Sequence, residues 1–199
     1  MGVEYELKFQ ADQQSREAIF RSYAGQWHTI TMETTYYDTK DGAFSAKRCT
    51  LRRRLENGKS ICTLKTPAGA VARGEWETEC DSIDTAIAEL CKLGAPSELA
   101  ALASEGLIPV CGAQFTRQAA QITYQDTQLE LALDQGILFG GSREEPLCEV
   151  EVELKSGLPE QADAFAKALA AQYGLQPQSL SKFARAAALR QEDDHGTAE

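Results

Sequence analysis

A repeated alternation of charged and apolar residues constrains this fold more than any other feature of the sequence. The first stretch, MGVEYELKF, places Glu4, Glu6 and Lys8 at alternating positions, with apolar or aromatic residues between them. In a β-strand successive side chains point to opposite faces, so the three charged side chains would share one face. The apolar residues would share the other face, which a hydrophobic core would cover.

Strand patterns of this kind continue along the chain. In TLRRRLENGKSICTLKTP, residues 50–67, the pair Asn57-Gly58 is the sequence signal of a two-residue hairpin turn. Further turns are predicted near Gln125-Asp126 and at Gly140-Gly141. The eight predicted strands are residues 2–9, 29–38, 48–56, 60–66, 73–80, 114–123, 127–135 and 147–154.

The charged strand faces have two interpretations. A sheet with one face in water explains any single hairpin. However, Glu149, Glu151 and Glu153 form a row on one strand, spaced about 7 Å apart. Neighbours in such a row repel each other by about 2 kcal/mol at an effective dielectric of about 20, so a positive partner is expected. The segregated charge therefore favours an enclosed site, and eight strands can close a barrel around a small ligand.

Helical patterns separate the strands. Asp12 and Ser82 are N-cap candidates for helices that end near Gly25 and Gly94, and two more helices are predicted at 159–174 and 179–191. The fold class is therefore α+β, with an eight-stranded antiparallel β-barrel and helices packed outside. We expect a single domain at residues 1–190 and a disordered polar tail at 191–199.

Composition excludes several function classes. The formal net charge of -10 argues against a nucleic-acid binder, which needs a basic surface. The sequence contains neither an apolar run of membrane-spanning length nor a leader pattern, so we expect a cytoplasmic protein without membrane contact. With only two histidines and six scattered cysteines, any metal is expected to be a hard cation held by carboxylates.

An ordered series of motifs resembles the CYTH family, the triphosphate tunnel metalloenzymes. The series comprises E-x-E-x-K at residues 4–8, LRRRLE, TLK, RGEWE, LALDQG, CEVEVELK and SLSKFAR, and it spans residues 4 to about 190. The resemblance is strongest to the bacterial inorganic triphosphatases. It implies an antiparallel tunnel that binds a triphosphate with basic side chains and Mg²⁺ or Mn²⁺ with glutamates.

The resemblance also assigns residues by motif position. It implies catalytic roles for Glu6, Lys8 and Glu151. The implied substrate-binding residues are Lys8, Arg52, Arg54, Lys65, Arg73, Arg117, Lys182 and Arg185. The implied metal ligands are Glu4, Glu6, Glu149, Glu151 and Glu153, and Glu75, Glu77, Glu130 and Asp134 are further acidic residues on the same wall.

The implied activity is metal-dependent hydrolysis of inorganic triphosphate to diphosphate and phosphate, in which a metal ion neutralises developing charge. Three alternatives stay open: a thiamine-triphosphatase, a class IV adenylate cyclase, and a non-catalytic polyphosphate or nucleotide binding module. Related triphosphatases often carry a C-terminal CHAD domain, which this chain is too short to include, so a role with phosphate-chain partners is in doubt. We expect a small-molecule triphosphate as the partner and a monomer or homodimer.

Overall fold

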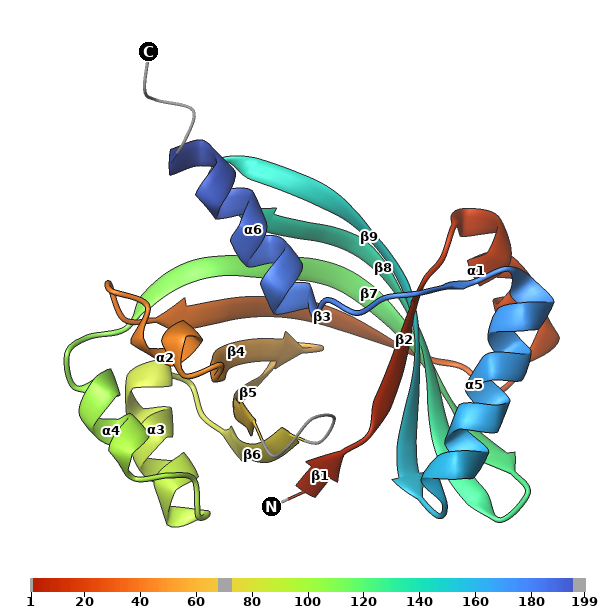
Figure 1. The fold of residues 1–199 in the computed structure, drawn as a ribbon, viewed down its shortest axis with the longest axis horizontal. Helices are drawn as coiled ribbons and strands as arrows, with labels where there is room; N and C mark the ends of the chain where they lie inside the picture. Colours follow the sequence, from red (N-terminus) through yellow and green to blue (C-terminus); the bar gives the residue numbers. More distant parts are fainter. Residues whose placement is uncertain (1, 68–72, 195–199) are drawn as a thin grey trace.

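The computed structural model describes residues 2–67 and 73–194 of the 199-residue chain, with side chains described for 5–67 and 74–190. A strongly curved antiparallel sheet dominates the fold, and helices flank it on both sides (Figure 1). The strands are β1 Gly2–Glu4, β2 Glu6–Gln10, β3 His28–Asp38, β4 Thr50–Glu56, β5 Lys59–Pro67, β6 Arg73–Glu79, β7 Ile108–Tyr124, β8 Thr127–Gly140, β9 Arg143–Ser156 and β10 Gln176–Pro177. The helices are α1 Gln13–Ser22, α2 Ala43–Ala46, α3 Ile83–Lys92, α4 Glu98–Ala103, α5 Pro159–Tyr173 and α6 Lys182–Asp194.

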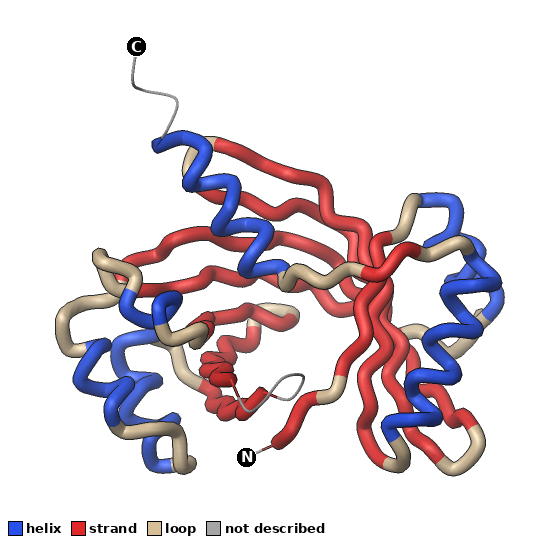
Figure 2. The backbone as a smooth tube through the Cα atoms, viewed as in Figure 1, coloured by secondary structure: helices blue, strands red, loops and turns tan. Residues whose placement is uncertain are grey.

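The N-terminal segment closes the sheet. The strand order is β1-β6-β5-β4-β3-β7-β8-β9-β2-β10, so β1 and β2 stand near opposite ends although only Tyr5 separates them in the chain. β1 pairs with β6 and β2 pairs with β9, and the backbone N–H of Leu154 donates to the Tyr5 carbonyl at 2.9 Å. The sheet therefore curls into a tunnel, and the tube view shows its strands following the curve (Figure 2).

The predicted fold class is confirmed, and each predicted strand is present, with β1 and β2 together forming the first. Asn57 and Gly58 adopt φ angles of 51° and 85°, as the two-residue hairpin turn requires. β7, β8 and β9 are longer than predicted, at 17, 14 and 14 residues, because their pairing continues beyond the charged stretches. The sequence did not predict α2, α4 or β10.

The four predicted helices are α1, α3, α5 and α6, and the predicted residues at the start of three of them accept backbone N–H groups of the first turn. A side-chain oxygen of Asp12 accepts the Ser15 N–H at 2.7 Å to cap α1, and Ser82 caps α3 by accepting the Asp84 N–H at 3.3 Å. Ser181 accepts the Ala184 N–H at 3.1 Å at the start of α6. α6 runs to Asp194, beyond the expected domain end at residue 190, and residues 195–199 lie outside the described part of the chain.

Apolar side chains on the outer face of the sheet make two cores with the helices. Val150 and Val152 of β9 are fully buried against α1 and α5, in a cluster that also includes Ile19 and Phe165. Leu64 of β5 belongs to a second cluster, with Trp76, Ile87 and Leu99, beneath α3 and α4. Because strand side chains alternate, burying these residues outside turns the charged residues inward.

α6 differs from the other helices, because it packs on the inner side of the curved sheet (Figure 1). Phe183 and Ala186 lie in a cluster with Met32, Tyr36 and Phe115, three residues that face the tunnel. A Cβ added at Gly140 of β8 would lie 2.2 Å from the Ala186 carbonyl oxygen, so α6 approaches the sheet backbone closely. The expectation that all helices pack outside is therefore wrong for α6, since its apolar face matches an apolar strip inside the tunnel.

Candidate active site

The inward faces of the strands enclose a charged cavity of about 580 Å³. Of the two interpretations of the charged strand faces, the structure supports an enclosed site rather than a sheet face in water. Its basic lining residues are Lys8, Arg52, Arg54, Lys65, Arg117, Lys155 and Lys182. Its acidic lining residues are Glu6, Glu56, Glu75, Glu77, Glu130, Glu151 and Glu153.

One wall of the cavity carries positive charge that the protein balances only in part. Arg52 and Arg54 alternate on β4 and are largely buried, and Arg54 pairs with Glu56. Burial lowers the pKa of Arg54, and the charge of Arg52 lowers it further. The Arg54 Nε atom is buried and has no hydrogen-bond partner in the described part of the chain. The alternating arginines and the unpartnered Nε make this wall suited to bind an anion. Lys8 lines the cavity from another side, on β2, where the register sets it opposite Glu151 of β9.

Lys65 of β5 completes this wall. Its Nζ lies 3.4 Å from an oxygen of Glu75, and Arg52 contacts the same oxygen at 4.0 Å. The register places Lys65 directly opposite Glu75, and Thr63 opposite Glu77. Two strands thus carry basic side chains beside a third strand that supplies carboxylates.

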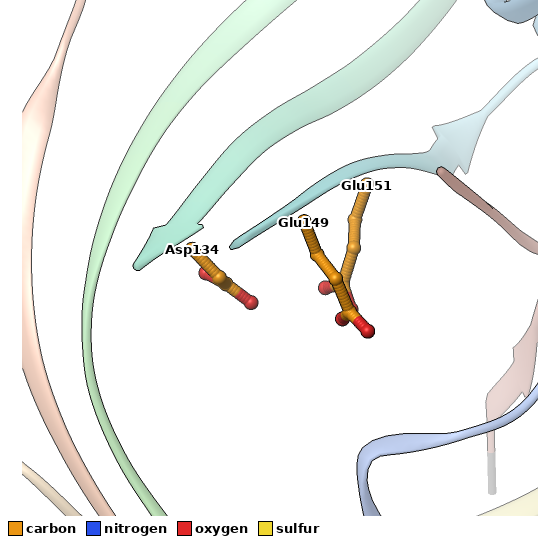
Figure 3. A group of neighbouring side chains, drawn as sticks. All are labelled: Asp134, Glu149 and Glu151. Carbon is orange, nitrogen blue, oxygen red and sulfur yellow. The ribbon is translucent and has the colours of Figure 1, made fainter. Parts of the chain in front are cut away.

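The opposite wall holds a buried acidic cluster, defined here as Asp134, Glu149 and Glu151 (Figure 3). A carboxylate oxygen from each lies within 4.8 Å of the others. The register explains the grouping, because Asp134 of β8 stands opposite Glu149 of β9 and Glu151 is two residues further along. Carboxylate oxygens are the ligands that Mg²⁺ and Mn²⁺ prefer, so the donor chemistry fits these cations.

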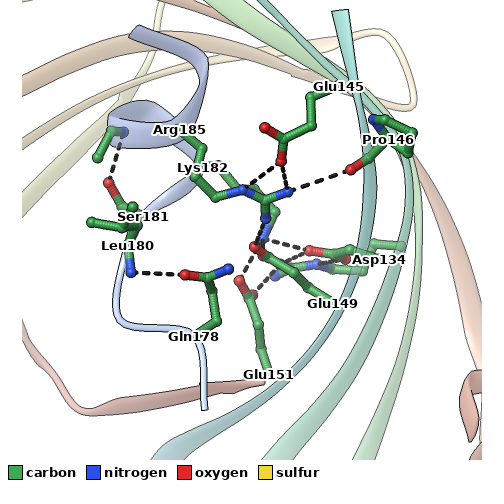
Figure 4. Close-up of polar contacts among 12 residues, drawn as sticks. Asp134, Glu145, Pro146, Glu149, Glu151, Gln178, Leu180, Ser181, Lys182 and Arg185 are labelled. Carbon is green, nitrogen blue, oxygen red and sulfur yellow. Dashed lines mark hydrogen bonds and ion pairs between the residues drawn. The ribbon is translucent and has the colours of Figure 1, made fainter. Parts of the chain in front are cut away.

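Three cations neutralise the acidic cluster, and two of them, Lys182 and Arg185, are labelled in Figure 4. Lys182 Nζ lies 2.9 Å from Asp134, 2.6 Å from Glu149 and 2.5 Å from Glu151. Arg117 donates to both oxygens of Asp134, at 2.8 and 2.7 Å, and also to Glu151. Arg185 donates to Glu149 at 2.5 Å and pairs with Glu145.

The pKa shifts follow from this pairing. Burial alone would raise the pKa of Glu151, but Lys182 and Arg117 outweigh it and hold this pKa well below its usual range. Burial would lower the pKa of Lys182, yet Asp134, Glu151 and Glu149 raise it well above its usual value. Glu151 and Lys182 are therefore both ionised at neutral pH.

Most of the predicted site residues meet in one place. Lys8, Arg52, Arg54, Lys65, Arg117 and Lys182 line the cavity with Glu6, Glu151 and Glu153. Glu149 is fully buried behind Lys182, and Arg185 binds it there rather than lining the cavity. The side chains of Glu4 and Arg73 lie outside the described residues, although their backbones pair with each other in the register of β1 and β6.

Sequence reasoning missed Lys155, Glu56 and the uncharged side of the cavity. Lys155 follows Glu153 at the same alternation on β9, so the pattern could have identified it. Ile30, Met32, Thr34 and Tyr36 alternate along β3 and also face the cavity. None of these four side chains carries a charge, and nothing in their residue types indicated a site.

The protein is therefore a β-tunnel protein, in which an antiparallel sheet encloses a cavity with a basic wall and an acidic wall. The chain belongs to the CYTH domain family, whose model matches residues 2–187. No helix within the described residues has the length and apolar character needed to cross a membrane.

Individual relatives agree with this assignment. The chain is 31% identical over 132 residues to an inorganic triphosphatase of Haemophilus influenzae, a stretch that covers 64% of this chain but only 37% of that relative. A Pyrococcus horikoshii protein matches with a TM-score of 0.66 and 21% identity, covering 94% of this chain and 99% of that one. A Hippeastrum protein, described as having a dominant triphosphatase activity, matches with a TM-score of 0.63 and 17% identity, covering 96% and 97% of the two chains.

Proposed function

We propose that this protein hydrolyses inorganic triphosphate to diphosphate and phosphate inside the tunnel, with Mg²⁺ or Mn²⁺ as cofactor. The observation that carries the proposal is the basic wall, where Arg54 has an unpartnered buried Nε and shares its face of β4 with Arg52. A triphosphate carries about four negative charges near neutral pH, and arginine and lysine donors along its length would offset them. The sequence similarity to an inorganic triphosphatase supports the same substrate.

The residues take distinct roles in this proposal. Lys8, Arg52, Arg54 and Lys65 hold the phosphate chain, with Arg73 on the neighbouring strand. Arg117 and Lys182 line the cavity on the side of the acidic wall and neutralise its carboxylates. Arg185 acts from behind, through Glu149. A divalent cation on the lumen carboxylates would neutralise charge that develops on the phosphate oxygens.

Glu6 and Glu151 are the proposed catalytic carboxylates. Both line the cavity, and the register sets Glu151 opposite Lys8 and Glu6 opposite Glu153. Since the pKa of Glu151 is held low, this carboxylate orients water rather than storing a proton. Glu4, Glu6, Glu149, Glu151 and Glu153 remain the proposed metal ligands, of which Glu149 is reachable only if Lys182 and Arg185 release it.

A second candidate is hydrolysis of an organic triphosphate such as thiamine triphosphate or ATP. Ile30, Met32, Phe115 and Phe183 give part of the cavity an apolar lining, which a purely inorganic substrate would not use. The Hippeastrum protein is described as a putative adenylyl cyclase with a dominant triphosphatase activity. Product analysis with ATP separates a hydrolase from a cyclase.

The test is phosphate release from inorganic triphosphate, thiamine triphosphate and ATP in parallel, with Mg²⁺, with Mn²⁺ and with EDTA. We expect metal-dependent release, fastest from inorganic triphosphate, that Glu6→Gln abolishes. Arg54→Ala should lower kcat/KM about 100-fold, since losing a buried charge-assisted contact costs about 3 kcal/mol. Arg53→Ala is the matched control, because Arg53 points away from the cavity and donates to Ser60 at 2.8 Å.

Two results would overturn the proposal. One is tight binding of all three compounds with no release, which would indicate a binding module. The other is an Arg54→Ala protein that keeps the kcat/KM of the parent, which would remove the basic wall from the reaction.

A further inference from the structure

Side chains on the inward face of β9 become more exposed to solvent from the tunnel interior towards its open side. Along it, the side chain of Glu149 is 0% exposed, that of Glu151 9%, that of Glu153 28% and that of Lys155 37%. Each glutamate has a cation partner from the protein: Lys182 for the two inner ones and Lys155 for Glu153. The outermost partner, Lys155, is the one that solvent and solutes reach first.

Lys155 stands at a row of three carboxylates on adjacent strands. The register sets Glu153 directly opposite Glu6 on β2 and opposite Glu130 on β8, and all three line the cavity. Lys155 Nζ lies 2.8 Å from Glu153 and 3.7 Å from Glu130. The second oxygen of Glu130 accepts from Gln121 Nε2 at 3.0 Å. The ammonium therefore pairs with two carboxylates of this row, Glu153 and Glu130.

A β-bulge places Lys155 there. Leu129 of β8 pairs with Leu154 and Gln128 pairs with Ser156, so Lys155 is the extra residue of β9 and has no partner in β8. Bulges re-aim a side chain without breaking the rest of the ladder. The bulge thus brings the Lys155 ammonium into contact with carboxylates of two adjacent strands.

Lys155 can also exchange its partners more readily than the buried cavity cations that form ion pairs. Its side chain is 37% exposed, against 10–15% for Lys182, Lys65, Arg117, Arg52 and Arg54. A divalent cation on the row would repel the ammonium strongly at contact distance. The nearest other partner is then the anionic substrate, because Lys155 lines the same cavity.

We propose that Lys155 is an exchangeable counter-ion: it holds Glu153 and Glu130 until a divalent cation takes its place, and it then contacts the phosphate chain of the substrate. The inference rests on the proposed function for the identity of the metal and of the substrate. It assigns to Lys155 a positioning role for the carboxylates and a binding role for the triphosphate.

The test measures two quantities that the proposal moves in opposite directions. Titration calorimetry with Mn²⁺ alone should show about two- to fivefold tighter binding to Lys155→Met than to the parent, since an exposed ion pair no longer competes. The KM for inorganic triphosphate at saturating Mn²⁺ should rise about three- to tenfold in the same variant, as expected for loss of a charge-assisted contact. Lys155→Arg should restore the parent KM.

Lys59→Met is the matched control. Lys59 forms a cross-strand pair with Glu79 at 2.5 Å, away from the cavity, and both of its readouts should equal those of the parent. Unchanged or weaker Mn²⁺ binding to Lys155→Met would overturn the counter-ion role, and an unchanged KM would overturn the substrate contact. If the parent releases no phosphate, the proposed function fails, yet calorimetry with Mn²⁺ and with triphosphate still decides both roles of Lys155.

Discussion

The substitution Arg117→Met tests how the acidic wall is held together. Arg117 makes two hydrogen bonds to Asp134, which is fully buried, and one to Glu151. Methionine keeps much of the side-chain length but removes the charge. The carboxylates would then share Lys182 and Arg185, leaving one more buried negative charge without compensation. Breaking a buried pair in this way costs about 3–5 kcal/mol of the free energy of unfolding at neutral pH.

The expected loss of unfolding free energy depends on pH. A packing defect at the same position would cost the same at both pH values. In the variant, protonation of one carboxylate relieves the excess charge, so the stability difference from the parent should shrink between pH 7.5 and about pH 4.5. Urea denaturation at the two pH values measures it. The double variant Arg117→Met/Asp134→Asn should recover much of the loss, because it removes one charge of each sign.

A surface pair provides the control for this experiment. Arg21 and Glu17 face each other on α1 at 3.7 Å with side chains 69% and 45% exposed, so Arg21→Met should change stability by less than about 0.5 kcal/mol. The reasoning would be refuted if Arg117→Met cost less than about 1 kcal/mol, or if its cost were equal at the two pH values.

Two further predictions concern the same wall. Gly140→Ala should lower the free energy of unfolding by about 1–3 kcal/mol and increase hydrogen exchange in α6, because the added Cβ would meet the Ala186 carbonyl oxygen at 2.2 Å. Since the pKa of Glu151 is lowered by folding, its contribution to stability is present above the unfolded pKa of about 4.3 and is lost as the pH falls towards the lower folded value. Glu151→Gln should therefore show a shallower decline of stability than the parent in urea titrations at acid pH.

The strands and much of the candidate site could be predicted from the sequence, because the alternation of residue types shows both that a segment is a strand and which side chains share its charged face. On β9, Val150 and Val152 indicated the buried outer face, and the same spacing gave Glu149, Glu151 and Glu153 the other face. Periodicity of two is a local property, so it needs no knowledge of partner strands.

What alternation cannot specify is which strands meet and at what register. The contact of Lys182 with Asp134 joins residues far apart in the sequence, and it depends on α6 entering the tunnel. The amphipathic pattern of α6 shows an apolar face but not which side of the sheet that face covers. The extra residue at Lys155 is likewise visible only in the pairing of β8 with β9.

The E-x-E-x-K stretch shows how local pattern and long-range pairing combine. Its backbone changes partners at Tyr5, whose hydroxyl donates to Asp163 of α5 at 2.6 Å, which fixes the outward side of the segment at the point of change. On one side of this point β1 lies beside β6, and on the other side Glu6 and Lys8 lie beside Glu153 and Glu151 of β9. One short segment therefore joins the strands next to the basic wall to those of the acidic wall. The side chains of Glu6 and Lys8 therefore face the cavity at the point where the tunnel closes.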